Sequence, residues 1–414
     1  MQWLVDILGQ IFSTLWSHKL RSFLTMFGIA WGVGSLLLLL GLGEGFRSGN
    51  QKRLDTVGEN VMFIFGGRIP AGNNSMLASR YYHLTYDDYR SLLQQEHIAA
   101  ATPVISRGDL HLASDWGTSN GQVFGIEPAF QKIRTTPLAQ GRLLNDLDVD
   151  QKRPVAVIGT EMVRILFPGR PAVGGTILIN GLRFEVVGTL KMIGRGKNIN
   201  DNQRVLIPFT EMRENFPLTG EGNREALSYI NFQPRERSMH WYAKSEARMA
   251  IAANHRFDPQ TPDAFDDWDS LETAETIGKL SDAMNTFLGA VGLVTLGLGA
   301  IGVVNIMLVN VSERTREIGL RKALGATSRN ILFHFFLEGL IITGLSGLAG
   351  LAGAWGVTRL LALLPPMEGF DMPHIVPLSA AMAMGGLALA GIFAGLYPAR
   401  QAAKLQPVEA LRAE

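Results

Sequence analysis

Four long apolar stretches divide the chain, and each is long enough to cross a lipid bilayer. They cover residues 22–43, 283–311, 331–358 and 376–397. A helix needs about 20 mostly apolar residues to span the hydrocarbon core of a membrane. Each stretch therefore predicts a transmembrane helix. The stretch 283–311 is longer than a bilayer requires, so we expect this helix to continue beyond the membrane as a stalk.

Two of these predicted spans contain pairs of glycines four positions apart. The first span carries Gly28 and Gly32, and the fourth carries Gly391 and Gly395. Glycines at this spacing form a flat strip on one side of a helix, which lets a second helix approach closely. We therefore expect these four glycines to be helix-packing positions.

Residues 44–282, between the first two spans, show the shorter patterns of a water-soluble domain. Short apolar and alternating runs predict strands over 61–65, 104–106, 122–125, 154–158, 176–179, 183–187 and 205–207. Helical spacing predicts helices over 85–95, 160–166, 210–215 and 239–254. Asn180 and Gly181, between two strand patterns, are typical of a tight hairpin. This mixture predicts an α+β domain of two lobes that ends in the stalk helix.

The N-terminal residues 1–21 have apolar positions at helical spacing, followed by His18, Lys19 and Arg21. This pattern predicts an amphipathic helix on the inner membrane face. A signal peptide is the alternative. The basic residues follow the first apolar stripe, and no small-residue cleavage site follows the next, so an uncleaved helix is favoured.

Charged residues between the spans predict how the chain crosses the membrane. The connector 312–330 and the tail 398–414 are rich in Lys and Arg, whereas the loop 359–375 carries Glu368 and Asp371 and no Lys or Arg apart from Arg359 at its start. Basic segments stay on the cytoplasmic side. We therefore expect a multi-pass protein with both termini and the connector in the cytoplasm, and with the loop 359–375 and the domain 44–282 outside.

The connector itself has features of a short charged helix. Glu317 and Arg321 are four positions apart in the order that favours an ion pair, and Gly325 is well placed to end the helix. Such a helix on the inner surface can contact a soluble partner. The alternative is that its charges serve only to fix the topology.

Composition agrees with a membrane part joined to a sizeable soluble part. The chain is 47% hydrophobic and 18% charged, and its net charge of +1 gives no reason to expect nucleic acid as a partner. The absence of cysteine excludes disulfides, thiolate metal sites and a cysteine nucleophile.

No pattern in the sequence indicates a catalytic, cofactor-binding or metal-binding site. A phosphate-binding GxxxxGK[ST] loop is missing, and Gly194–Lys197 is expected to be a basic loop only. The histidines have no zinc-binding spacing, and Asp146, Asp148 and Asp150 lack the rest of a calcium loop. The acidic run Asp263, Asp266, Asp267 and Asp269 is expected to be solvated.

Two ionisable residues lie one helical turn apart inside the third predicted span. His334 and Glu338 are functional candidates, because charged groups are costly inside a membrane. A proton relay is one interpretation. The favoured one is that they sit at the membrane interface or bond to neighbouring helices.

Four sequence segments resemble the permease part of the MacB/FtsX/LolC–LolE superfamily of ABC transporters. LRSFLTMFGIAWGVGSLLLLLGLGEG (20–45), IGVVNIMLVNVSERTREIGLRKALGAT (301–327) and YPARQAAKLQPVEALR (397–412) are similar to its membrane segments. VAVIGTEMVRILFP with VGGTILINGLRFEVVGTL (155–190) looks like the periplasmic core domain of the MacB type. The resemblance implies a four-span permease of the bacterial inner membrane that dimerises, with an inserted lobe at about 108–206 of its two-lobed periplasmic domain.

The resemblance also implies a function. In this family the connector between the second and third spans contacts the ATP-hydrolysing subunit, so the implied coupling residues are Glu313, Arg314, Arg316, Glu317, Gly319, Arg321, Lys322 and Gly325. The ATPase domain that is fused before the first span of the MacB exporter is not present in this sequence. The chain itself is therefore expected not to be an enzyme, and ATP and Mg²⁺ are expected to bind a separate ATPase subunit.

The expected activity is mechanical. ATP-driven closure of the partner moves the connector, and the stalk helix passes this motion to the periplasmic domain, which expels a substrate. The second permease subunit is a second copy or a paralogue. A periplasmic adaptor and an outer-membrane channel are further expected partners. Alternatives are a LolC/LolE-like lipoprotein release, an FtsX-like activation of a cell-wall hydrolase, or a membrane-anchored enzyme or sensor.

Overall fold

The computed structural model of the chain describes residues 19–58, 60–70, 79–193, 200–218, 225–364, 370–406 and 410. It divides into two compact units, one from Met1–Asn50 with Ile277–Glu414 and one from Gln51–Thr276. We call them the membrane unit and the inserted domain. The predicted helix over 1–21 falls outside the described residues except for its last three positions, and so does Gly194–Lys197.

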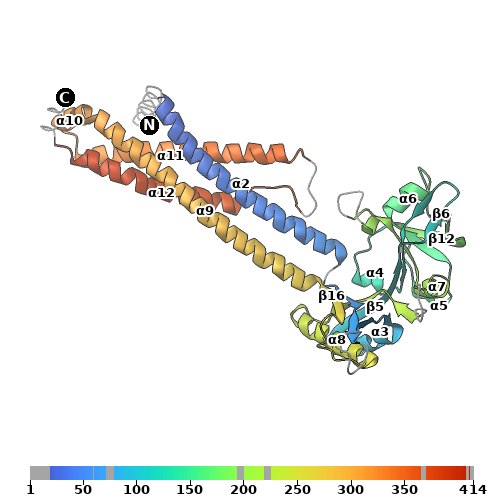
Figure 1. Cartoon of the computed structure of the whole chain (residues 1–414). Coiled ribbons are helices and arrows are strands. Elements are labelled where there is room, and N and C mark those ends of the chain that lie inside the picture. The colour runs from blue at the N-terminus through green and yellow to red at the C-terminus, as the bar shows by residue number, and fades with distance from the viewer. Residues whose placement is uncertain are drawn as a thin grey trace. The chain divides into compact units, whose positions relative to one another are not determined.

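Four long helices account for the four predicted spans (Figure 1). They are α2 (Lys19–Val57), α9 (Ser270–Glu313), α11 (Ser328–Leu361) and α12 (Pro377–Lys404), with the short helix α10 (Thr315–Ala323) between α9 and α11. Among the described residues, these four long helices are the ones apolar enough to cross a membrane. At 44 residues, α9 corresponds to about 66 Å of helix, roughly twice a hydrocarbon core. This helix therefore continues well beyond the length of one span.

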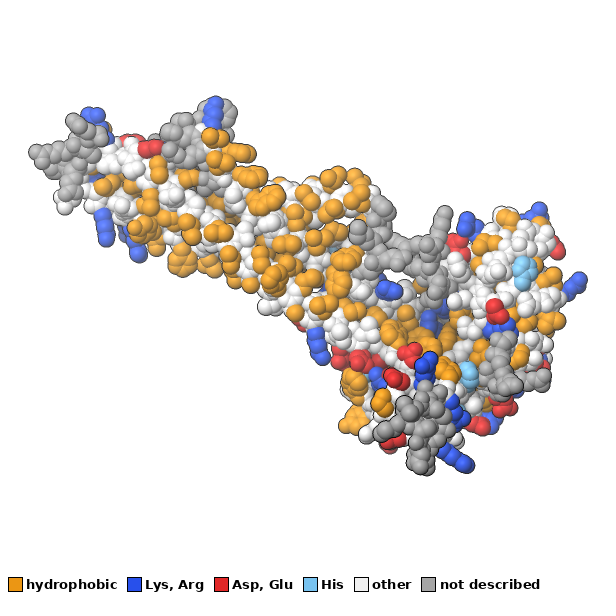
Figure 2. All heavy atoms as spheres, viewed as in Figure 1, with side chains coloured by type: hydrophobic (Ala, Val, Ile, Leu, Met, Phe, Trp, Pro, Cys, Tyr) orange, Lys and Arg blue, Asp and Glu red, His pale blue; other side chains and the backbone are white. Residues whose placement is uncertain are grey.

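The membrane unit is apolar both between its helices and on their outer surfaces. Its buried cluster combines Val33 of α2, Met307 of α9, Phe335 of α11 and Ala399 of α12. Hydrophobic side chains also cover much of the outer surface of these helices (Figure 2). Exposed apolar area of this extent is unfavourable in water and favourable in a bilayer.

The inserted domain is an α+β fold. Its strands are β1 (Met62–Gly66), β2 (Arg68–Pro70), β3 (Ser79–Tyr81), β4 (Leu84–Thr85), β5 (Ile98–Arg107), β6 (His111–Ala113), β7 (Thr118–Asn120), β8 (Gln122–Ile126), β9 (Leu138–Gly141), β10 (Val155–Ile158), β11 (Thr176–Ile179), β12 (Leu182–Leu190), β13 (Arg204–Pro208), β14 (Ala226–Leu227), β15 (Tyr229–Pro234) and β16 (Phe265–Asp269). Its helices are α3 (Tyr86–Leu93), α4 (Phe130–Ile133), α5 (Asp146–Asp150), α6 (Thr160–Leu166), α7 (Phe209–Asn215) and α8 (His240–His255), with short 3₁₀ turns at Asn200–Gln203 and Arg237–Met239.

One mixed sheet runs through this domain. Its order is β16-β1-β15-β5-β8-β13-β10-β12-β11-β6-β7, and β9 pairs with β12. The pairs β8–β13 and β10–β12 are parallel, and the other ladders are antiparallel. The strands from β6 to β13 in sequence form one end of this order, and β16, β1, β15 and β5 form the other end.

All seven strands and all four helices predicted in this domain are found, with bounds that differ by a few residues. The hairpin is also confirmed, because Asn180 (φ 47°) and Gly181 (φ 89°) both adopt positive φ between β11 and β12. Among the longer strands, β15 and β16 were not predicted. The sequence of β16, FDDWD, is acidic, which is not typical of a strand. The sequence of β15, YINFQP, has strand-forming Tyr, Ile and Phe but ends in proline, which is depleted in strands.

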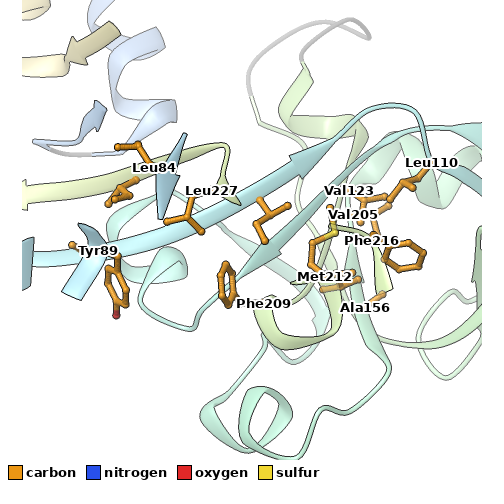
Figure 3. Packing of buried hydrophobic residues seen from close by; sticks show 14 of the residues in the cluster. Leu84, Tyr89, Leu110, Val123, Ala156, Val205, Phe209, Met212, Phe216 and Leu227 are labelled. Atoms are coloured by element: carbon orange, nitrogen blue, oxygen red, sulfur yellow. The ribbon is translucent and has the colours of Figure 1, made fainter. Parts of the chain in front are cut away.

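The main hydrophobic cluster joins the sheet to helix α7 (Figure 3). Phe209, Met212 and Phe216 pack against strands that contribute Val123, Val205 and others. A side chain at Gly125 of β8 would collide with Met212. Glycine at this position therefore lets the helix lie directly on the strand.

Candidate coupling site

Helix α10 lies within the predicted connector and ends as the sequence suggests. Arg314 precedes its first residue, and the backbone N–H of Arg314 donates to the carbonyl oxygen of Asn310 (3.2 Å). At the other end, Gly325 has φ 99°. Its N–H donates to the carbonyl oxygen of Lys322, and the N–H of Ala326 donates to the carbonyl oxygen of Arg321, each at 3.0 Å. This is the Schellman arrangement, so the predicted cap at Gly325 is confirmed.

One face of α10 is held against the rest of the membrane unit. Ile318 is 2% exposed and belongs to the same buried cluster as Ala399 and Ala402 of α12. Gly319 is buried, and a Cβ at this position would lie 2.6 Å from the Cβ of Ala410. Only glycine permits so close an approach here.

Lys322 connects the same face to the end of α12. Its ammonium donates to the carbonyl oxygens of Ala403 (2.6 Å) and Leu405 (2.8 Å). The last carbonyls of a helix have no partner within the helix and carry partial negative charge. Lys322 therefore satisfies and neutralises the C-terminal end of α12.

An ion pair between a buried carboxylate and a partly exposed arginine lies at the start of α10. The carboxylate of Glu338 on α11 is 1% exposed, and one of its oxygens lies 3.7 Å from a guanidinium nitrogen of Arg314. Removing one partner of such a pair leaves a buried charge without compensation. Glu338 is thus paired with a residue between α9 and α10, but neither of its carboxylate oxygens has a hydrogen-bond partner among the described residues. The roles of Glu338 and His334 stay predictions.

The opposite face of α10 is exposed. Arg316 and Glu317 are exposed, and so are Leu320 (53%) and Leu324 (80%) just beyond them. Arg316, Leu320 and Leu324 follow each other at intervals of four and therefore share one side of the helix. Glu317 also accepts a 2.6 Å hydrogen bond from Arg321, which confirms the predicted pair.

The structure therefore separates the eight implied coupling residues by position. Arg314, Gly319 and Lys322 hold the helix, Gly325 ends it, and the remaining four residues, Glu313, Arg316, Glu317 and Arg321, lie at least partly in the open. Leu320 and Leu324 were missed by sequence reasoning. The feature of the sequence that could have indicated them is a pair of leucines at helical spacing within an otherwise charged segment.

The predicted packing glycines differ in their surroundings. A Cβ at Gly32 would lie 3.2 Å from Thr295 of α9, one at Gly391 would lie 2.9 Å from Thr343 of α11, and one at Gly395 would lie 3.7 Å from Phe336 of α11. Apart from the adjoining residues and backbone of α2 itself, no described residue has an atom within 4 Å of a Cβ at Gly28. A packing role for Gly28 stays a prediction.

The acidic segment before α9 is not the solvated face that we expected. His240 Nδ1 of α8 lies 2.7 Å from Asp269, which is 4% exposed and accepts the N–H of Leu271 in the first turn of α9. Asp267 pairs with Lys244 and Arg248 of α8. Only Asp263 and Asp266 are exposed. The acids were misjudged because their partners lie on a helix distant in sequence, and together they anchor the start of the stalk.

Asp148, which lies in the acidic run that resembles half a calcium loop, is fully buried. Its oxygens lie 2.5 and 2.9 Å from the two terminal nitrogens of Arg142 and also accept the N–H of Asn145. Burial alone would raise the pKa of this carboxyl, but these hydrogen bonds hold the pKa of Asp148 below its usual range. Within the part of the chain that the structure describes, no cluster of potential metal ligands is found.

Two family models match the chain. The MacB-like periplasmic core domain matches residues 22–252, and the FtsX-like permease C-terminal domain matches residues 289–407. The first match covers more than half of the chain and includes most of α2 and most of the inserted domain. The second includes α10, α11 and α12 and most of the membrane-spanning part of α9.

Individual relatives agree with these matches. The chain is 31% identical to the macrolide export ATP-binding/permease protein MacB of Bdellovibrio bacteriovorus, over 99% of this chain but only 62% of that protein. It is 29% identical to the ABC transporter permease YknZ of Bacillus subtilis, over 99% of this chain and all of YknZ. The crystal structure of the periplasmic region of MacB from Actinobacillus actinomycetemcomitans is 21% identical, with a TM-score of 0.43 over 54% of this chain and 95% of that region.

The fold has the features that these domains lead one to expect. Four apolar helices fit a multi-pass membrane protein, and an α+β domain of the periplasmic type lies between the first and the second of them. Both the inserted domain and the membrane helices match one family in the same order along the chain. The chain therefore belongs to the MacB/FtsX-like family of ABC transporter permeases.

Proposed function

We propose that the chain is a permease subunit driven by a separate ATPase subunit, and that the exposed face of α10 is where the ATPase binds. The observation that supports this is the two-sided character of α10. One side is fixed by the Arg314–Glu338 pair, by Gly319 and by Lys322. The other side presents Leu320 and Leu324 next to charged residues. A force applied to this side would move α10 together with the helices that hold it.

The chemistry of the exposed face suits a protein partner. Apolar side chains surrounded by charges are typical of interface centres, where a few residues supply most of the binding free energy. In water alone, the 80% exposure of Leu324 does not stabilise the protein. In the proposed complex, burial of Leu320 and Leu324 stabilises binding, and Arg316 and Glu317 select the partner.

Helix α9 is the proposed transmission element. It is one uninterrupted helix from Ser270 to Glu313, next to Arg314 at one end and to the contact between Asp269 and His240 at the other. A continuous helix resists bending over its length because every turn is hydrogen-bonded. Movement of α10 would therefore be passed along α9 to the inserted domain, which we propose acts on a substrate outside the cytoplasm.

Further components complete the proposal. The ATPase subunit would bind ATP and Mg²⁺, and a second permease copy or a paralogue would complete a dimer. Gly28, with Trp31 (66% exposed) beside it on α2, offers a surface for that second subunit. Export is favoured as the direction because the Bdellovibrio relative is named as a macrolide exporter. A periplasmic adaptor and an outer-membrane channel would then carry the substrate onward, with lipoprotein release and hydrolase activation as alternatives.

The substitution Leu324→Glu tests the docking face. We expect it to weaken the binding of the ABC ATPase that co-purifies with the wild-type chain by about thirtyfold, which corresponds to about 2 kcal/mol for an interface centre. Binding is measured with the two purified components, and stimulated ATP hydrolysis is measured in the same samples.

Leu363→Glu is the matched control. Leu363 is 81% exposed, as Leu324 is, but follows α11 at its other end. This variant should bind the ATPase as the wild type does. Equal binding by the Leu324→Glu variant and the wild type would contradict the assignment of this face.

A further inference from the structure

The membrane unit has a surface pocket at the end where α10 lies. It has a volume of about 570 Å³ and is formed by Lys322 of α10, the first turns of α11 and the last turn of α12. Its lining includes three cationic side chains, Lys322, Arg400 and Lys404, and no acidic one among the described residues. Leu332 and Leu405 add apolar surface. Positive charge beside apolar surface suits an amphiphilic anion.

Two of the three cations are exposed and can face such a ligand. Arg400 and Lys404 lie four positions apart, on one side of α12. Lys322 is engaged with the carbonyls of Ala403 and Leu405. By neutralising the negative end of α12, Lys322 removes the charge that would otherwise repel an anion at this place.

The side of α12 that carries these cations changes character along its length. Leu389 (59% exposed), Phe393 (74%) and Tyr397 (60%) precede Arg400 and Lys404 at intervals of three or four residues. The order is therefore aliphatic, aromatic, then cationic. A phospholipid presents the same order from its acyl chain through the interface to its phosphate, and tyrosine favours the level between them.

We propose that this pocket binds the headgroup of an anionic phospholipid, with the phosphate at Arg400 and Lys404 and an acyl chain along Tyr397, Phe393 and Leu389. Basic pockets between membrane helices are suited to such headgroups. The site belongs to the leaflet in which α10 lies. It does not depend on the ATPase proposal, because Arg400 and Lys404 are not on the exposed face of α10.

The test measures lipid binding to the full chain purified in detergent, by native mass spectrometry. Phosphatidylglycerol should bind more tightly than phosphatidylcholine, and the double variant Arg400→Gln/Lys404→Gln should lower its affinity about tenfold. Arg329→Gln is the matched control, since Arg329 is an exposed cation at the same end of α11 but does not line the pocket. It should change the affinity less than about twofold.

Several outcomes would overturn the proposal. An equal loss in the Arg329→Gln variant would show that surface charge in general attracts the lipid. Displacement of phosphatidylglycerol by millimolar inorganic phosphate would show a free-phosphate site, and equal binding of phosphatidylcholine would show that the pocket does not recognise headgroup charge. Arg400→Lys/Lys404→Arg, which keeps both charges, should bind phosphatidylglycerol about as tightly as the wild type, and a loss of binding in this variant would contradict recognition by charge.

Discussion

At the scale of single residues, the most informative side chains are buried carboxylates with fixed donors. Asp88 of α3 is fully buried and accepts hydrogen bonds from the backbone N–H of Thr85 (2.7 Å) and the side chain of Asn254 (2.8 Å), with His255 Nε2 also 2.7 Å away. Asp148 is satisfied by Arg142 and Asn145. Because a buried carboxylate without such partners is very costly, these sets of donors specify how helices and strands fit together.

The substitution Asp148→Asn should destabilise the inserted domain by about 2 kcal/mol at neutral pH, because it removes a charge-assisted pair of hydrogen bonds. The pKa of Asp148 is lowered in the folded state. Its contribution is therefore fully present above its ordinary pKa of about 3.9 and is lost as the pH falls through the lower folded pKa. The thermal unfolding midpoint of the detergent-solubilised chain, measured from pH 7 to pH 3, should differ between wild type and variant most at pH 7.

Asp109→Asn is the control for this measurement. Asp109 also pairs with an arginine, Arg107, but its side chain is 65% exposed, and exposed pairs contribute little to stability. The thermal unfolding midpoint of the Asp109→Asn variant should remain close to that of the wild type. A pH-independent difference for the Asp148→Asn variant would contradict the role given to the ionised carboxylate.

At the scale of elements, α10 shows how a short polar helix is held against long apolar ones. Its burial depends on small residues, because Gly319 faces Ala410, and on Lys322 at the end of α12. Its sequence, TREIGLRKA, contains more charged residues than apolar ones. Tertiary contacts therefore position this helix, since so short a helix is not stable alone.

The substitution Gly319→Val should push α10 away from its neighbours, because there is no room for a side chain beside Ala410. The chain contains no cysteine, so Ile318→Cys supplies a single reporter at a position that is 2% exposed. Maleimide should label this cysteine slowly in the parent and at least about tenfold faster with Gly319→Val, since labelling requires the buried side to open.

Ala323→Val serves as the matched control on the same helix. Ala323 is exposed, and valine lowers helix propensity in place of alanine, whereas it raises helix propensity in place of glycine. Labelling of the reporter cysteine introduced by Ile318→Cys should stay slow in this variant. Equally fast labelling in both variants would mean that helix propensity, not the contact at Gly319, keeps α10 in place.

At the scale of the whole molecule, the chain is a membrane unit interrupted by a large domain. The membrane unit combines segments from both ends of the sequence, and the inserted domain occupies Gln51–Thr276. Helices α2 and α9 contain the residues on both sides of these two boundaries. This arrangement would let one polypeptide present a domain on one side of a bilayer and a docking helix on the other.

The corresponding prediction is that these two parts are accessible from opposite sides of the membrane. Single cysteines at Leu324 (80% exposed) and at Trp116 (43% exposed) are introduced separately into the cysteine-free chain. In cells with a permeabilised outer membrane, a membrane-impermeant maleimide should label the Trp116→Cys chain and not the Leu324→Cys chain, because the positive-inside rule keeps the basic connector inside.

Disruption of the cells should expose the second site, and both variants should then be labelled. Labelling of the Leu324→Cys chain before disruption would contradict the proposed orientation, and with it the docking of a cytoplasmic ATPase on α10.

Much of the architecture was determined by local sequence patterns. The four apolar stretches, the predicted strands and helices, the hairpin at Asn180 and the helix end at Gly325 all depend on residues a few positions apart. Such patterns can be recognised because helix and strand periodicity, span length and positive φ are properties of short segments. The connector motif likewise indicated the family from consecutive residues.

Only the tertiary structure decided which side of each element is buried or paired and which side is exposed. It paired Glu338 with Arg314, Asp269 with His240 and Asp148 with Arg142, and it left Leu320 and Leu324 in the open. It also placed the acidic strand β16 at the edge of the sheet, next to β1. The physical reason is that burial and charge pairing depend on segments distant in sequence, whose approach no local pattern records.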